Sequence, residues 1–332
     1  MSETASRLTD GPPERAFEGD SPVRGLPVGV RRAVKTAVRA YAVATRPLRH
    51  GPDFLLVGAK RAGTTTLYGA LVRHPDVAPL FPRIERIKSP HYFDLQHDRG
   101  QRWYRSHFPI RTPLGRDRIT GDAAPYLLYH PLAPAWAGRE VPDARVLVML
   151  RDPVERAFSH HWDRVKNGVE TLPFEQAVDA EEERLAGQEE LLRADPATPR
   201  PAHEHFSYLD RGRYAPQLRR WLEHYPSAQI LVVRCEDFHA QPEEVFAHVC
   251  AFLGIAAWTP PRFGRHHAHG DKPRVEPALR RRLAATFAEP NEDLARLLGT
   301  PVWWDADGPT HLDRPGVLQP PPAGGGHAGS LP

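Results

Sequence analysis

The chain alternates short apolar runs with longer amphipathic segments. The apolar runs occupy residues 54–57, 145–150 and 230–233, the second of them apolar after its first residue. The segments beside them predict helices over residues 65–73, 154–167, 216–224 and 242–253. Short apolar runs separated by helices are typical of parallel strands that are covered on both faces. The pattern therefore predicts an α/β fold with a central parallel sheet.

The remaining segments extend this domain on both sides. Residues 170–205 are charged and predict a helical insertion or lid, and residues 277–287 and 292–298 predict terminal helices. Residues 28–50 are basic and weakly helical, whereas the two ends of the chain are rich in Pro and Gly and lack apolar runs. We expect a basic, partly disordered extension at 1–50, one domain at 51–305 and a disordered tail at 306–332.

Composition narrows the class of protein. Of the 332 residues, 40% are hydrophobic and 26% are charged, the balance of a globular protein with a buried core. A net charge of +3 is too small to indicate a general nucleic-acid binder. The apolar runs are far shorter than the roughly 20 residues that a membrane helix needs, and no secretory signal is visible. We therefore expect a cytoplasmic protein without a transmembrane segment, in which residues 28–50 form either a solvated helix or a peripheral contact to an anionic membrane or a partner.

Cysteine and lysine are both rare in this chain. Only two cysteines occur, which excludes a disulfide framework, and they do not have the spacing of metal ligands. Five of the 44 basic residues are lysine, and the others are arginine. A lysine is therefore unusual wherever it stands in this sequence.

Residues 58–66 form a glycine-bounded turn between the first predicted strand and the next helix. Gly58 and Gly63 bracket the turn, and the threonines at 64–66 open the helix. Such a turn presents backbone N–H groups and the positive end of a helix dipole to an anion. Lys60 and Arg61 add two positive charges. We call residues 58–66 the phosphate loop.

Two differences separate this loop from that of a magnesium-dependent nucleotide triphosphatase. The triphosphatase has a lysine directly after the second glycine, where this chain has Thr64. The strand at 145–150 leads into Arg151, where the triphosphatase usually has an aspartate, and Asp152 comes one residue later. These differences favour an anion site without a metal. An ordinary turn between a strand and a helix is the alternative.

A second candidate anion site follows the strand at 145–150. Arg151 leaves the carboxyl end of that strand, the edge at which open α/β sheets bind ligands. Pro153 suits the first turn of a helix, and Arg156 and Ser159 would project from that helix. The arginine and serine side chains of this motif are suited to hold a further phosphate.

These motifs, taken together, resemble those of a known family. PDFLLVGAKRAGTTTLY and VLVMLRDPVERAFSHHW resemble the sulfotransferases that use 3′-phosphoadenosine-5′-phosphosulfate (PAPS), and in particular bacterial enzymes similar to the sulfotransferase domains of heparan-sulfate modification. Further segments agree in order and spacing, namely residues 74–77, 91–94, 121–126, 208–214 and 230–238. The resemblance covers residues 52–304. It implies a P-loop-like, three-layer α/β fold with a central parallel sheet and helical insertions.

The resemblance also implies which residues bind the donor. The family's loop surrounds the 5′-phosphosulfate, and the arginine and serine of its second motif bind the 3′-phosphate. A basic loop near the C-terminus, which closes over the donor in the family, is matched loosely by residues 269–274. The donor-binding residues implied here are Lys60, Arg61, Ala62, Gly63, Thr64, Thr65, Thr66, Arg151, Ser159, Lys272 and Arg274. No metal is implied.

The chain departs from the family at the leaving group. The family usually has a lysine where Arg61 stands, and that lysine contacts the oxygen that departs from sulfur. Negative charge grows on this oxygen during transfer, so a cation beside it is worth several kcal/mol. Arginine supplies charge but does not readily give up a proton. Either Arg61 or the adjacent Lys60 is expected to balance the charge.

The second departure concerns the general base. A glutamate has this role in the heparan-type enzymes, and Ser89 stands at its position here. Serine is not a base at neutral pH. We therefore expect His91 to take the acceptor proton, since imidazole titrates near neutrality, and Asp94 to orient it. Glu85 and Asp122 are the alternatives.

These residues predict a PAPS-dependent sulfotransferase. It would move a sulfuryl group to a hydroxyl or an amine of a saccharide, glycolipid or other small-molecule acceptor and release 3′-phosphoadenosine-5′-phosphate. Residues 96–108 and 170–201 are expected to line the acceptor cleft, and no feature indicates a nucleic-acid partner. Two other classes stay open, a P-loop nucleotide kinase and a PAPS-binding relative without turnover.

Overall fold

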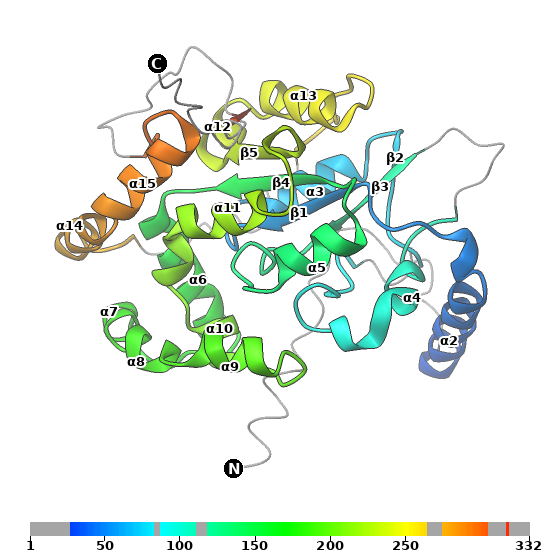
Figure 1. Cartoon of the computed structure of the whole chain (residues 1–332), viewed down its shortest axis with the longest axis horizontal. Coiled ribbons are helices and arrows are strands. Elements are labelled where there is room, and N and C mark those ends of the chain that lie inside the picture. Colours follow the sequence, from blue (N-terminus) through cyan, green and yellow to red (C-terminus); the bar gives the residue numbers. More distant parts are fainter. Residues whose placement is uncertain (1–26, 83–86, 111–117, 264–273, 305–316, 319–332) are drawn as a thin grey trace, which may run out of the picture.

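A single sheet organises the part of the chain that the computed structural model describes, residues 27–82, 87–110, 118–263, 274–304 and 317–318. Its strand order is β2-β3-β1-β4-β5-β6 (Figure 1). Parallel pairing joins β2 (Val77–Ala78), β3 (Ile119–Ala123), β1 (Phe54–Gly58), β4 (Arg145–Leu150) and β5 (Ile230–Arg234). The last strand, β6 (Val317–Leu318), runs antiparallel to β5.

Helices flank both faces of this sheet, with α13 on one side and α5 and α11 on the other (Figure 1). The helices of the domain are α3 (Thr64–Leu71), α4 (Gly100–Arg105), α5 (Ala133–Glu140), α6 (Pro153–Lys166), α11 (Tyr214–Leu222), α12 (Cys235–Ala240), α13 (Pro242–Leu253), α14 (Pro277–Thr286) and α15 (Ala288–Leu298). The charged insertion forms four short helices, α7 (Phe174–Asp179), α8 (Glu181–Leu185), α9 (Gln188–Ala194) and α10 (Pro201–His205). A further helix, α2 (Val28–Ala44), precedes the sheet. This architecture is the P-loop-like α/β fold that the sequence predicts.

The central strands lie in the core because they are apolar on both faces. Every residue of β1 and β5 is buried, and so is every residue of β4 after the first. A second, smaller core lies between α6 and the insertion, where Phe158 packs against Phe174 with ring centroids 5.0 Å apart. The insertion is thus packed onto α6, the helix that carries the second motif.

The strands expected at 54–57, 145–150 and 230–233 are confirmed, and the helices beside them begin or end one or two residues from the expected positions. The sequence analysis missed β3, because Thr120, Gly121 and Asp122 interrupt its apolar pattern although all three are buried. It also expected disorder throughout 306–332. That expectation is wrong for Val317 and Leu318, which pair with β5. The other residues of this segment lie outside the described part of the chain.

Parallel pairing places the carboxyl ends of β1 and β4 side by side, with Gly58 opposite Val148. The phosphate loop follows β1, and the second motif follows β4. The two candidate anion sites therefore meet at the carboxyl edge of the sheet, where open α/β folds bind ligands.

Candidate active site

Within the phosphate loop, the residue before α3 is a glycine with a left-handed backbone conformation. Gly63 has φ of 88° and forms the N-terminal cap of α3, a conformation in which a side chain would be strained. The backbone N–H groups of Thr66 and Leu67 donate to the Gly63 carbonyl at 3.0 and 3.1 Å. The N–H groups at the very start of a helix have no partner within it. The local geometry therefore suits an anion at this turn.

Arg61 connects the phosphate loop to α6. Its Nε donates to Ser159 Oγ at 3.2 Å, and its Nη1 lies 3.2 Å from Asp163 Oδ1. Burial acts to raise the pKa of Asp163, but the charges of Arg61 and Arg164 outweigh it and hold that pKa below its usual value. In return, the Arg61 carbonyl accepts a hydrogen bond from Arg151 Nη1 at 3.1 Å. The structure thus brings Arg61, Arg151 and Ser159 together at the carboxyl edge of the sheet.

The carboxylate after β4 has a structural use. Asp152 caps α6, and its side chain accepts from the backbone N–H groups of Val154 and Glu155 at 2.8 and 3.3 Å. Its second oxygen accepts from Arg280 Nη2 at 2.7 Å. A carboxylate held in this way is engaged in the fold and is poorly suited to a magnesium ion. This counts against the nucleotide kinase alternative.

His91 and Asp94 form a hydrogen-bonded pair. His91 Nδ1 lies 3.0 Å from Asp94 Oδ2, and the Asp94 side chain is fully buried while that of His91 is 28% exposed. His91 has φ of 56°, an uncommon value for a residue with a side chain, and its backbone N–H donates to Ser89 Oγ at 2.8 Å. Asp94 is therefore placed to orient the imidazole, as expected.

Asp122 is the buried neighbour of this pair. Its side chain has no exposed area, its Oδ2 accepts from the Tyr104 hydroxyl at 2.9 Å, and burial raises its pKa to about 6. Next to Asp122 in the chain, the Ala123 backbone N–H donates to the Lys88 carbonyl, with 2.9 Å between the two atoms. Because it is sealed from solvent, Asp122 is a poorer candidate than His91 for direct contact with an acceptor. The other alternative, Glu85, lies outside the described residues.

The structure adds Lys88, which the sequence analysis did not assign to the site. Its side chain is 1% exposed, and its Nζ donates to Thr65 Oγ1 at 3.2 Å, in the first turn of α3. A buried ammonium is costly unless an acceptor or an anion lies beside it. The rarity of lysine in this chain was a signal that could have found it. The contact itself could not be predicted, because Lys88 and Thr65 are 23 residues apart in the sequence.

Three further residues were predicted to bind the donor, namely Lys60, Lys272 and Arg274. Lys60 is partly buried, and its charge contributes, after burial itself, to a pKa of His160 well below the usual value. Lys60 therefore lies near α6, close to Arg61. Arg274 is exposed, whereas Lys272 and the other residues of the closing loop expected at 269–274 lie outside the described residues.

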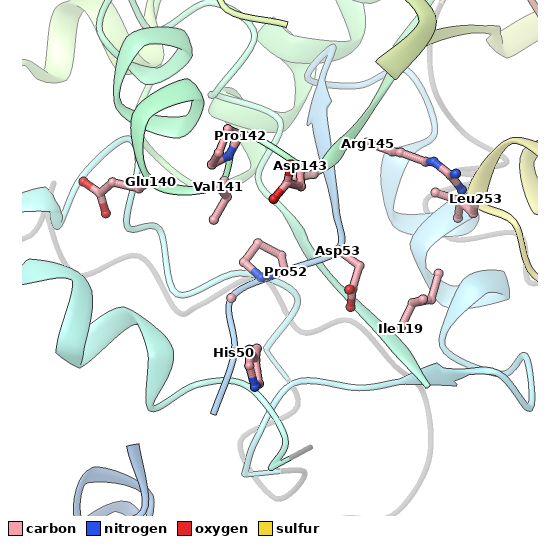
Figure 2. A pocket seen from close by; sticks show the side chains of 12 residues that line it. His50, Pro52, Asp53, Ile119, Glu140, Val141, Pro142, Asp143, Arg145 and Leu253 are labelled. Carbon is pink, nitrogen blue, oxygen red and sulfur yellow. The ribbon is translucent and has the colours of Figure 1, made fainter. Parts of the chain in front are cut away.

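A pocket of about 460 Å³ lies at the opposite, amino edge of the sheet (Figure 2). Asp53, Ile119 and Arg145, which line it, stand at the starts of β1, β3 and β4. Two of its acidic side chains have structural partners, since Asp53 accepts from Thr120 N–H at 2.8 Å and Glu140 accepts from the Tyr92 hydroxyl at 2.9 Å. This pocket is therefore separate from the candidate active site.

Within the described residues, no group of three or more His, Cys, Asp or Glu side chains is placed to hold a metal ion. No helix in the described part of the chain is long and apolar enough to cross a membrane.

The fold and the two linked motifs define a P-loop-like α/β protein with a candidate anion site at the carboxyl edge of its sheet. Residues 51–269 match the family model described as the sulfotransferase domain. This match covers well over half of the chain, so the chain belongs to the sulfotransferase domain family.

Similar proteins include human heparan sulfate glucosamine 3-O-sulfotransferase 3A1, 30% identical over 247 residues, which are 73% of this chain and 55% of that protein. The human bifunctional heparan sulfate N-deacetylase/N-sulfotransferase 3 is 28% identical over 207 residues, 61% of this chain and 22% of that protein. The chain thus spans only part of the length of these relatives. Among solved structures, a sulfotransferase from Alicyclobacillus acidocaldarius is 29% identical, with a TM-score of 0.56 over 76% of this chain and 98% of that one.

Proposed function

We propose that this protein is a PAPS-dependent sulfotransferase. The contact that carries the proposal is the hydrogen bond from Arg61 to Ser159, because it joins a loop suited to a phosphosulfate with a motif suited to a second phosphate. A donor with phosphates at both its 5′ and 3′ ends needs two neighbouring anion sites of this kind. The membership of the sulfotransferase domain family supports the same reading.

The donor-binding residues fit a polyanion. Arg61, Arg151 and Lys88 carry positive charge at the carboxyl edge of the sheet, and the first turn of α3 adds backbone donors. Ala62 and Gly63, followed by the threonines at 64–66, form the backbone of that turn. Arg151 and Ser159 would hold the 3′-phosphate. Lys272 and Arg274 complete the proposed set as the loop that closes over the donor.

Lys60 and Arg61 are proposed to balance the charge of the leaving group. The Arg61 side chain spans to α6 in this structure, where Ser159 and Asp163 hold it. Lys88 approaches the same turn from the buried side, through Thr65. We include Lys88 as a third cation for the phosphosulfate. Charges fixed in place before the reaction cost no reorganisation when negative charge develops.

His91 is proposed as the general base. PAPS supplies the sulfuryl group, and the acceptor hydroxyl or amine must lose one proton as it attacks sulfur. Asp94 holds Nδ1 of the imidazole at 3.0 Å, so Nε2 is the nitrogen that would take this proton. Asp94 would then stabilise the imidazolium. Ser89, at the usual glutamate position, holds the His91 backbone in its left-handed conformation.

The acceptor is proposed to be a saccharide or another small molecule. Two relatives are named for heparan sulfate, a saccharide polymer. We further propose that the protein acts in the cytoplasm, with peripheral contact to a membrane surface through residues 28–50.

Transfer from PAPS carrying radioactive sulfur, with a panel of saccharide acceptors, tests this function. We expect label in an acceptor and stoichiometric release of 3′-phosphoadenosine-5′-phosphate without added magnesium. The His91→Ala variant is the control that should bind the donor but transfer nothing. Donor binding by the wild type without transfer to any acceptor would favour the non-catalytic relative, and activity that needs ATP and magnesium would favour a kinase.

A further inference from the structure

Residues 28–52 carry positive charge that no acidic residue offsets. They include six arginine or lysine residues and no aspartate or glutamate, whereas the chain as a whole is nearly balanced at +3. The basic residues are Arg31, Arg32, Lys35, Arg39, Arg46 and Arg49. A local excess of this size attracts anionic partners even when the whole protein does not.

The same segment concentrates exposed apolar side chains. Of the eight large hydrophobic side chains that are exposed in the described residues, five lie between residues 28 and 48, and three lie elsewhere. The five are Val28, Val30, Tyr41, Val43 and Leu48, with exposed fractions between 36% and 72%. Exposed apolar side chains are thus more frequent in this segment than in the rest of the described residues.

Spacing separates part of the charge from the apolar groups along α2, although Val28 and Val43 lie on the same side of the helix as the basic residues. Val30, Val34, Ala37 and Tyr41 follow one another at intervals of four, three and four residues, which places them on one face of the helix. Arg32, Lys35 and Arg39 follow at three and four residues on the opposite face. A helix with one apolar and one basic face is suited to lie in the plane of a membrane interface.

Most of α2 is exposed, although Arg39 Nη1 donates to Ser106 Oγ at 3.5 Å and the Tyr41 ring lies 6.1 Å from that of Phe81. Ala42 is the one buried residue of α2, and the helix is held mainly at its C-terminal end. There the buried Arg49 donates through Nη1 to the Phe108 carbonyl, and its guanidinium lies 4.2 Å from the centre of the Phe81 ring. Figure 1 shows α2 at the margin of the molecule, at the far end from α14 and α15.

We propose that residues 28–50 bind the surface of an anionic lipid bilayer. The basic face would meet lipid headgroups, and Val30 and Tyr41 would enter the boundary with the acyl chains. The exposed apolar side chains favour a bilayer over a nucleic acid, because a phosphate backbone offers them no apolar partner. This inference names the lipid class and the residues for the peripheral contact proposed above, and it does not depend on the chemistry at the active site.

Sedimentation of the full chain with vesicles tests the proposal. At low salt we expect binding to vesicles that contain phosphatidylglycerol and little binding to vesicles of phosphatidylcholine alone. Each basic residue near an anionic surface contributes about fivefold to partitioning, so Arg32→Gln with Lys35→Gln should weaken binding about 30-fold. The matched control is Arg281→Gln with Arg296→Gln, two exposed arginines on α14 and α15. It should bind like the wild type.

Two further measurements separate the possible failures. Val30→Asp should also weaken vesicle binding, because it places a charge on the apolar face. The affinity for 3′-phosphoadenosine-5′-phosphate should be unchanged in all of these variants, which separates this proposal from the proposed function. Equal binding to the two kinds of vesicle, equal losses in the test and control pairs, or binding to double-stranded DNA but not to vesicles would overturn the proposal.

Discussion

Arg61 Nε lies 3.2 Å from Ser159 Oγ, across 98 residues of sequence. The loop after β1 and the helix after β4 are thereby tied together at the point where the two phosphate groups of a PAPS donor would be held. A 3′-phosphate at Ser159 would compete for the hydroxyl that Arg61 now contacts. Donor binding is therefore expected to rearrange Arg61.

The Arg151→Ala variant should bind the donor poorly. Arg151 Nη1 donates to the Arg61 carbonyl at 3.1 Å, and we propose that this side chain meets the 3′-phosphate. A hydrogen bond to a charged group is worth roughly 1.5–3 kcal/mol, so the KM for PAPS should rise about 10- to 100-fold while the KM for the acceptor changes little. Initial-rate kinetics with each substrate varied in turn measure both constants. An unchanged KM for PAPS would remove Arg151 from the donor site.

Replacement of Lys88 should weaken the phosphosulfate site. In Lys88→Met the long side chain remains but its charge is lost beside Thr65, so we expect a fall of about 10-fold or more in kcat/KM for PAPS. Lys88→Arg keeps the charge and should recover part of the loss. Lys166→Met, at an exposed lysine of α6, is the matched control. Thermal unfolding checks that the fold survives, and full activity in a folded Lys88→Met protein would contradict the assignment.

His91→Ala should lose turnover but keep donor affinity. Loss of a general base costs about 10²- to 10⁴-fold in rate, whereas the donor-binding contacts are made by other residues. Single-turnover kinetics and donor titration separate the two effects. Adding Ser89→Glu to this variant places a carboxylate where the resemblance to heparan-type enzymes implies one. This should recover part of the rate, and the rate should then fall at acidic pH near the pKa of a carboxylate. Wild-type rates in His91→Ala alone would place the base elsewhere.

Asp122→Asn should change how stability depends on pH. Burial raises the pKa of Asp122 from 3.8 to about 6, so the folded state holds its proton more tightly than the unfolded state does. This contribution to stability is fully present below about pH 4 and is lost as the pH rises through about 6. Asn cannot ionise, so the variant should gain stability relative to the wild type over that window, by up to about 3 kcal/mol. Thermal unfolding at a series of pH values measures the difference, and a constant difference would contradict the assigned pKa.

Much of the fold was predictable from periodicity, because β1, β4 and β5 are apolar on both faces and stand between amphipathic helices. In contrast, β3 was not predicted, because its polar residues are buried with hydrogen-bond partners from elsewhere in the fold. The Tyr104 hydroxyl, for example, donates to Asp122. The phosphate loop and the second motif are adjacent because β1 and β4, which precede them, pair in parallel. The contact of Lys88 with Thr65 was not predictable, because no local pattern encodes how the segment before His91 folds back on α3.

The most direct test of the proposed function is calorimetric titration with 3′-phosphoadenosine-5′-phosphate in the absence of magnesium. Adenosine-5′-phosphosulfate and ATP serve as the comparison ligands. The joined sites at Arg61 and Ser159 predict tight binding that depends on the 3′-phosphate and is weakened in Arg151→Ala. Absence of binding, together with binding of ATP only when magnesium is present, would contradict the sulfotransferase and favour a kinase.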